Sequence, residues 1–165
     1  MTNLKSYINP DLLNKEEIDP RWLESPFINL KRLKAKQAGA RYEQVSESIL
    51  TGLGYNVQKP LSSDHDRIIN GKKTEMKGSM MTKAKKDGIF SFLQIRPDQD
   101  YEQILFTVFD FDSVKMYFMD KDTINKKIEE GIFKKQHGGN KGTSRTFSYN
   151  GTIEGIGEGL KEVTI

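Results

Sequence analysis

The chain has no cysteine and only two histidines among its 165 residues. Without cysteine it can form neither disulfides nor thiolate zinc sites, and it has no thiol nucleophile. The two histidines, His65 and His137, are too few for a histidine-rich metal cluster. We therefore expect any metal to be a hard ion held by oxygen ligands.

Long hydrophobic runs are also missing. Hydrophobic residues make up 35% of the chain, and its mean hydropathy is −0.66. No run approaches the roughly 20 apolar residues of a membrane-spanning helix, and the N-terminus lacks the apolar stretch of a secretory signal. We expect a soluble, cytoplasmic protein with no membrane partner, of a length that fits one domain.

The net charge of +3 is small, but the charges are unevenly distributed. Basic residues gather in 31–41, 72–86 and 126–145, and acidic residues gather in 98–122 and 154–162. Such segregation is typical of a protein that presents a positive face to a polyanion. Ordinary solvated faces are the alternative explanation for any one of these clusters.

The segment from Asp64 to Lys77 is the most informative part of the chain. Asn70 and Gly71 form the dipeptide that most strongly indicates a two-residue hairpin turn, because both central positions need φ > 0. Counting outward from this turn places Asp66 directly opposite Glu75. Asp64 falls across from Lys77 on the same face. Because two opposed carboxylates repel each other, the pattern predicts a cation between them.

This constellation predicts a magnesium site with a cationic helper. Asp66 and Glu75 supply carboxylate oxygens, and the Met76 carbonyl, which lies between Glu75 and Lys77, is a plausible further ligand. The Met76 side chain should point the other way, into the core. Lys77 would lie beside a metal-bound water and offset negative charge in the transition state. A charged, solvated hairpin is the alternative. The adjacent Ile68 and Ile69 also leave the strand register open to a one-residue slip.

The other patterns predict an α/β fold with a mixed central sheet flanked by helices. We expect an N-terminal arm over 1–27 and a single domain over 28–165. The segment 90–96 fits a strand or a short helix, and we favour the helix. The other expected elements are a helix over 27–51 that can break at Gly39 and ends at Gly52 and Gly54, strands at 55–57, 104–109 and 114–119, a helix from Asp122 or Thr123 to Glu130, and a glycine-rich basic loop over 134–145. The expected core residues are Ile49, Leu53, Val57, Met76, Leu105, Val108, Met116 and Phe118.

Several motifs over residues 38–145 resemble the PD-(D/E)XK nuclease superfamily, and type II restriction endonucleases within it. They are Gly39-Ala-Arg-Tyr-Glu43, Gly52-Leu-Gly-Tyr55, Asp66-x8-Glu75-x-Lys77, the stretch Phe92–Tyr101 and Gln136-His-Gly-Gly139. The resemblance implies a restriction-endonuclease-like core and a Mg²⁺-dependent DNA endonuclease. It also implies Asp66 and Glu75 as metal ligands, Lys77 as the catalytic lysine and Glu43 as an accessory carboxylate.

One departure from this family concerns the first aspartate. The proline expected before it is absent, and Ser63 or His65 stands there, depending on whether Asp64 or Asp66 is meant. We assign Asp66, because only it opposes Glu75. Glu47 lies four residues after Glu43 on the same helix face and is an alternative accessory carboxylate.

The partner expected from the resemblance is double-stranded DNA. The candidate DNA contacts are Gln94, His137, Asn140, Lys141 and Arg145, which are residue types that contact base edges or phosphates. Cutting both strands of a symmetric site needs two active sites, which favours a homodimer. Alternatives are a repair or junction nuclease of the same fold and a DNA-binding subunit that does not cut.

Overall fold

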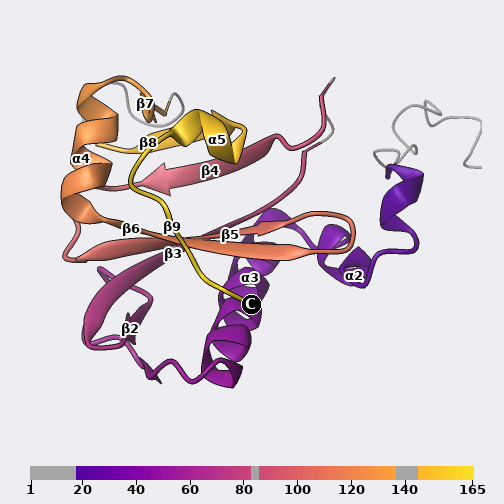
Figure 1. Ribbon diagram of the computed structural model, residues 1–165, viewed down its shortest axis with the longest axis horizontal. Coiled ribbons are helices and arrows are strands. Elements are labelled where there is room, and N and C mark those ends of the chain that lie inside the picture. The colour runs from indigo at the N-terminus through magenta and orange to yellow at the C-terminus, as the bar shows by residue number, and fades with distance from the viewer. Residues whose placement is uncertain (1–17, 83–85, 137–144) are drawn as a thin grey trace, which may run out of the picture.

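The computed structural model of the chain describes residues 18–82, 86–136 and 145–165. The elements form three layers (Figure 1): α3 lies on one face of a six-stranded sheet, and a smaller three-stranded sheet and α4 cover the other. The helical elements are η2 (Pro20–Trp22), α2 (Ile28–Lys31), α3 (Ala35–Gly52), α4 (Lys121–Glu129) and α5 (Ile153–Ile156). No helix in these ranges is long and apolar enough to cross a membrane.

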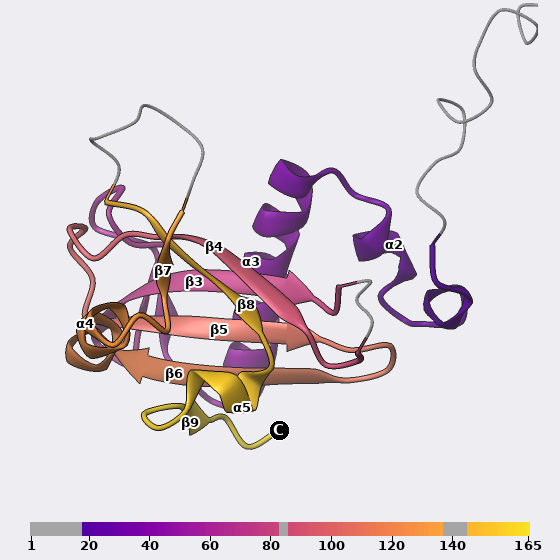
Figure 2. The same ribbon diagram turned by 90° about the horizontal axis from the view of Figure 1, so that it is seen from above.

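The six-stranded sheet has the order β1-β2-β3-β5-β6-β9, and only its β3–β5 pair is parallel. The smaller sheet has the antiparallel order β4-β8-β7 and crosses above the larger one (Figure 2). The strands are β1 (Val57–Gln58), β2 (Arg67–Ile69), β3 (Lys72–Met80), β4 (Phe90–Ile95), β5 (Gln103–Phe109), β6 (Val114–Asp120), β7 (Lys134–Lys135), β8 (Phe147–Gly151) and β9 (Lys161–Glu162). The predicted α/β class with a mixed sheet is therefore confirmed.

The predicted Asn-Gly turn joins β2 to β3. Asn70 has φ 48° and Gly71 has φ 81°, the positive values that this turn requires. Arg67 pairs with Thr74, as counting from the turn predicted, and the next two pairs follow in the same register. The local sequence thus sets the register of the hairpin that carries the candidate carboxylates.

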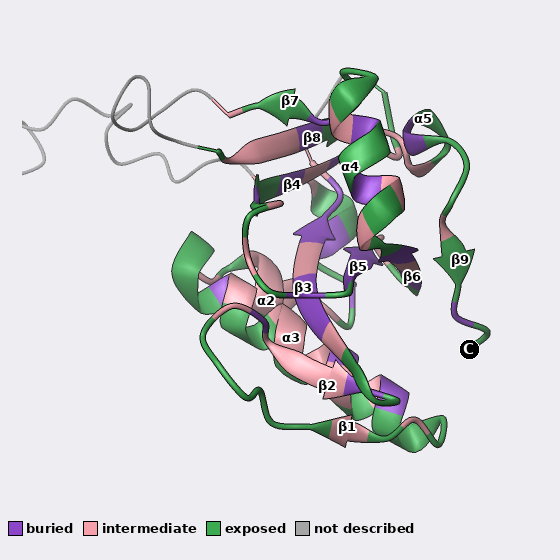
Figure 3. Ribbon diagram, turned by 90° about the vertical axis from the view of Figure 1, so that its left-hand side faces the viewer, coloured by how far each residue is buried: buried purple, intermediate pink, exposed green. Residues whose placement is uncertain are grey.

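The central strand β5 is buried at every position, as its continuous apolar sequence predicted (Figure 3). On one face, Phe106 packs edge-on against Phe92 of β4, with 4.8 Å between ring centroids. On the opposite face, the Thr107 hydroxyl lies 2.7 Å from the Ser46 hydroxyl of α3. The core therefore fills both sides of the larger sheet.

Three sequence-based expectations were wrong in detail. Residues 90–95 form strand β4, because Phe90 and Phe92 alternate into the core and the strand pairs with β8. The first long helix is interrupted at Lys34, which is extended (ψ 154°), and continues through Gly39. Helix α4 starts at Lys121, because Asp120 accepts a hydrogen bond from the Thr123 N–H at 2.8 Å and so caps the helix.

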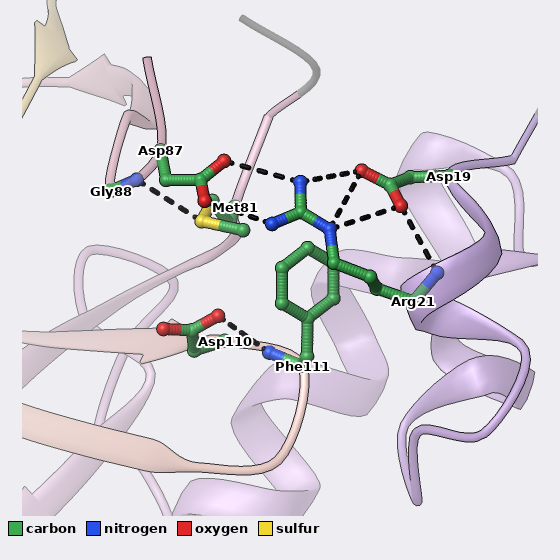
Figure 4. A network of polar contacts seen from close by, with 7 residues as sticks. All are labelled: Asp19, Arg21, Met81, Asp87, Gly88, Asp110 and Phe111. Carbon is green, nitrogen blue, oxygen red and sulfur yellow. Dashed lines mark hydrogen bonds and ion pairs between the residues drawn. The ribbon is translucent and has the colours of Figure 1, made fainter.

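The segment before α2 is held to the core by Trp22 and Arg21. Trp22 is 2% exposed and packs on Phe111, with ring centroids 4.7 Å apart. The Arg21 guanidinium lies 4.3 Å from the centroid of the Phe111 ring and bridges Asp19 and Asp87 at 2.8 Å each (Figure 4). Of the predicted arm over 1–27, residues 18–27 are therefore anchored to the core, and residues 1–17 lie outside the described part.

Candidate active site

Asp66 lies at the edge of β3, just before β2 begins. Its N–H donates at 3.0 Å to the carbonyl of Thr74, which is already the strand partner of Arg67, so the regular pairing does not extend to Asp66 and Glu75. Its carboxylate accepts a hydrogen bond from the Met76 N–H at 2.7 Å. Among the described strands, β2 pairs with β3 only as far as Thr74. Beyond that point the carboxylate takes the place of a strand partner and is held at the open edge of β3.

Glu75 and Lys77 lie two residues apart on β3 and share a face of the strand. The Lys77 ammonium donates to a Glu75 carboxylate oxygen at 2.7 Å, and the two side chains are only 16% and 12% exposed. Burial raises the pKa of Glu75, and the charge of Asp66 and a hydrogen bond between the two carboxyl groups raise it further, against the lowering effect of Lys77. Asp66 and Glu75 are therefore not the strand partners that counting from the turn predicted, although their carboxyl groups interact.

Glu43 reaches the same place from α3. Two small groups let the helix approach the sheet: Gly78, whose missing Cβ leaves room for the Tyr42 side chain, and Ser46, which bonds Thr107. Burial raises the pKa of Glu43 to about 7, aided by the charges of Asp66 and Glu75 and opposed by Arg67 and Lys77. Glu43 therefore lies in the electrostatic field of the hairpin carboxylates.

Glu47 and His65 have other partners. The Glu47 carboxylate accepts a hydrogen bond from the Arg67 guanidinium at 2.7 Å. This partner distinguishes Glu47 from Glu43, which lies on the same helix face. His65 is 3% exposed. Its Nε2 accepts from the Leu61 N–H at 3.2 Å, which leaves Nδ1 to donate to the Asp100 carbonyl at the same distance. His65 thus holds the loop before Asp66 in place.

The donor set can be tested against a divalent metal. Within the described residues no group of three or more histidine or carboxylate side chains is placed to hold an ion. Asp66 and Glu75 remain as a close pair, and the Met76 carbonyl points to the same edge as its N–H. Mg²⁺ is commonly bound by one or two carboxylates while it keeps several waters. Burial and the charge of Asp66 raise the pKa of Glu75. A small hard cation beside the two carboxylates would offset this repulsion, so the site fits such an ion.

Glu43, Met76 and Lys77 line an open groove of about 910 Å³, whereas Asp66 and Glu75 lie outside its lining. Lys31, Lys36 and Glu43 line one side, Met76 to Met80 of β3 form its floor, and Ser91, Leu93 and Gln94 of β4 line the other. Of the two candidate DNA contacts that the structure describes, Gln94 lines the groove and Arg145 does not. Arg145 is exposed at the end of a described range, and His137, Asn140 and Lys141 lie outside the described residues.

Tyr101 was not identified from the sequence. Its hydroxyl is buried and has no hydrogen-bond partner among the described residues. Burial raises the pKa of Tyr101, and the nearby charge of Glu75 adds to this effect. The Lys121 ammonium lies 4.3 Å from the centroid of its ring. No local motif marks this tyrosine, because its proximity to Glu75 arises from the pairing of β3 with β5.

Comparison with known proteins gave one similar structure. The chain matches no protein-family model, and no curated protein sequence is significantly similar to it. A solved structure described as a bacterial homing endonuclease, I-Ssp6803I, superposes with a TM-score of 0.44 at 16% identity, covering 72% of this chain and 75% of that chain.

Neutralising Glu43 should stabilise the protein at high pH. A carboxyl whose pKa is raised from about 4.5 to about 7 on folding lowers stability as pH rises through that window. We therefore expect Glu43→Gln to melt about 3 °C higher than wild type at pH 8, or about 1 kcal/mol after allowance for solvent screening. At pH 4.5 the variant and wild type should melt at the same temperature. Thermal unfolding in chelator measures this. Equal melting temperatures at pH 8 would contradict the assigned crowding of charge.

Proposed function

We propose that this protein is a Mg²⁺-dependent endonuclease of the PD-(D/E)XK type that hydrolyses phosphodiester bonds of double-stranded DNA, as a type II restriction enzyme. The observation that carries the proposal is the meeting of Asp66, Glu75, Lys77 and Glu43 beside an open groove that Glu43 and Lys77 line. Two of these residues were predicted to face each other from the turn alone. The groove also has lysines along one wall, which suits a polyanionic substrate.

Each residue of this site has a distinct role in the proposal. Asp66 and Glu75 hold the ion, with the Met76 carbonyl as a further ligand and Glu43 as an accessory carboxylate. Magnesium bound there would polarise the phosphoryl group and acidify a water. Lys77, nearly desolvated beside Glu75, keeps a fixed positive charge next to the attacked phosphate, where such a charge has most effect. The reaction needs no nucleophilic side chain, in keeping with the lack of cysteine.

Digestion of unmethylated phage DNA tests this proposal. We expect discrete bands with Mg²⁺, no cutting in chelator, and no cutting by Asp66→Asn under either condition. A smear with Mg²⁺ would indicate a nuclease without site preference. Selective cutting of branched duplexes would indicate a junction or repair nuclease instead. DNA binding without cleavage under any metal would replace the proposal with a non-cleaving DNA-binding subunit.

A homodimer follows from the proposed activity. Concerted cleavage of both strands at a symmetric site needs two active sites related by a two-fold axis. We expect sedimentation of the DNA-bound protein in Ca²⁺ to give two chains per duplex. One chain per duplex, together with nicked plasmid as the stable product, would contradict the dimer and leave the nuclease activity in place.

The carboxylates should differ in their importance for cutting. We expect Asp66→Asn and Glu75→Gln to abolish measurable cleavage, and Glu43→Gln to lower it by about 10- to 100-fold, since Glu43 lies on a separate element at the margin of the pair. Single-turnover rates measured over a range of Mg²⁺ concentrations provide the ranking. If Glu43→Gln folds and is as inactive as Asp66→Asn, then Glu43 is a direct metal ligand.

A further inference from the structure

Strand β4 contains a bulge at the groove. Phe92 pairs with Tyr149 of β8, and the next pair joins Ile95 to Phe147. Three steps along β4 therefore match two steps along β8, so β4 carries one extra residue. Bulges of this kind redirect side chains and are common beside functional sites.

The extra residue turns two consecutive side chains outward. In a regular strand Gln94 would follow Phe90 and Phe92 into the core. Instead, Ile95 takes the inward position with 0% exposure, and both Leu93 and Gln94 are exposed. Leu93 is 54% exposed, and both side chains line the groove that starts at Glu43 and Lys77. The fold thus presents an apolar side chain and a carboxamide next to each other.

Gln94 adopts a left-handed conformation to achieve this, with φ 56°. A residue with a Cβ is disfavoured there by roughly 1–2 kcal/mol. The conformation is held by the Gln136 side chain, whose amide oxygen accepts from the Gln94 N–H at 2.9 Å, while the Gln136 N–H donates to the Thr146 carbonyl at 2.8 Å. Within the described ranges no hydrogen bond engages the Gln94 carboxamide. The left-handed conformation therefore leaves its amide donor and its carbonyl acceptor open to the groove.

We propose that Leu93 and Gln94 form a base-reading element that recognises an A·T pair in the major groove of duplex DNA. A glutamine amide matches the N6 donor and N7 acceptor of adenine, and an apolar side chain matches the C5-methyl of thymine. The bulge supplies this pair of chemistries from adjacent positions. The inference rests on the proposed function, since it requires that duplex DNA enter the groove.

Positive charges around the bulge favour duplex DNA in the groove. Lys134 and Lys135 are exposed on β7, the strand that ends beside Gln136 and belongs to the same small sheet as β4. Lys36 lines the opposite side of the groove. Cations on both sides of a base-reading element would contact phosphates and fix the register of the duplex, while the element itself selects the sequence.

The test starts with selection of bound duplexes from a random pool in Ca²⁺, which blocks cutting. We expect wild type to enrich a sequence containing at least one fixed A·T pair. We then expect Gln94→Gly and Leu93→Ala to lose about 10- to 100-fold of the discrimination against G·C at that pair. Gln58→Ala and Leu23→Ala, which change exposed side chains outside the groove, should keep the wild-type preference. Gln94→Gly also suits the left-handed position, so it should fold.

Base analogues separate base reading from a structural role. Replacing adenine by 7-deazaadenine at the assigned pair removes the N7 acceptor, and replacing thymine by uracil removes the methyl group. We expect the first change to weaken wild type but not Gln94→Gly, and the second to weaken wild type but not Leu93→Ala. A bulge that only shapes the fold would leave wild type and both variants equally sensitive to each analogue.

The outcomes distinguish this inference from the proposed function. Wild-type binding without sequence preference, or an unchanged preference in Gln94→Gly, overturns the base-reading role and leaves the nuclease proposal standing. Failure of wild type to bind any duplex overturns both. Loss of preference at one A·T pair, with matching insensitivity to the analogues, supports the inference.

Discussion

Lys77→Ala should lower the single-turnover rate of DNA cleavage by about three orders of magnitude, with little change in DNA affinity measured in Ca²⁺. Its ammonium lies 2.7 Å from Glu75 in a nearly desolvated pair. A fixed charge in such a place acts mainly on the transition state, where removal of one stabilising group costs about 10²–10³-fold and removal of a proton-transfer partner about 10²–10⁴-fold. Quench-flow cleavage and equilibrium binding measure the two effects separately.

Lys73→Ala is the matched control on the same strand. Lys73 also pairs with a carboxylate at 2.7 Å, that of Asp100, but it is 34% exposed and its partner is 62% exposed. A surface pair of this kind contributes little, so cleavage should stay within about twofold of wild type. Robust cutting by Lys77→Ala, or an equal loss in Lys73→Ala, would refute the role assigned to Lys77.

The hairpin was predictable because its determinants are local. Asn70 and Gly71 are the residues that the turn needs, and a two-residue loop sets the register of both strands without reference to the rest of the chain. The same holds for strand β5, whose apolar residues match burial on both faces. The end of α3 was also predictable: Gly54, at φ 90°, terminates it with the hydrogen bond from the Tyr55 N–H to the Leu50 carbonyl.

Strand β4 was mistaken for a helix because the bulge disturbs its pattern. A strand places apolar residues two apart, whereas Phe92 and Ile95 are three apart, a spacing typical of helices. Only the pairing with β8 reveals the extra residue. The bulge also creates the exposed Leu93, which apolarity alone would assign to the core.

The core was predicted in part for a related reason. Of the expected residues, Met76, Leu105, Val108 and Met116 are buried, whereas Leu53 is 40% exposed beyond the last turn of α3. The aromatic cluster was missed altogether. Phe92, Phe106 and Phe133 meet only because the small sheet and the segment after α4 fold over the large sheet. No local pattern encodes that packing.

Which of Glu43 and Glu47 is the accessory carboxylate likewise depends on tertiary contacts. Both lie on one face of α3, four residues apart, and sequence offers no way to separate them. Arg67, which reaches Glu47 from β2, makes the difference. The position of α3 over the hairpin, set by close packing at Gly78, then brings Glu43 to the edge of β3.

This close packing makes Gly78→Ala the strongest structural test of the site. A Cβ at this position would lie 2.6 Å from Tyr42 Cγ, and closer still to Tyr42 Cβ, which is fixed to the helix backbone. Because rotation of the ring cannot relieve this overlap, α3 must move away from β3 by about 1 Å. We expect a loss of about 3 kcal/mol in the free energy of unfolding, or about 10 °C in melting temperature, since overpacking in a filled core costs this much.

The same displacement should reduce catalysis in the protein that remains folded. Moving α3 carries Glu43 away from Asp66 and Glu75, and a misplacement of about 1 Å can cost about 100-fold in rate. Gly39→Ala is the matched control, because a Cβ there meets nothing within 4 Å and the position is helical. That variant should be about 1 kcal/mol more stable than wild type. If Gly78→Ala is as stable as Gly39→Ala and cuts DNA at the wild-type rate, then close packing of α3 on β3 does not position Glu43.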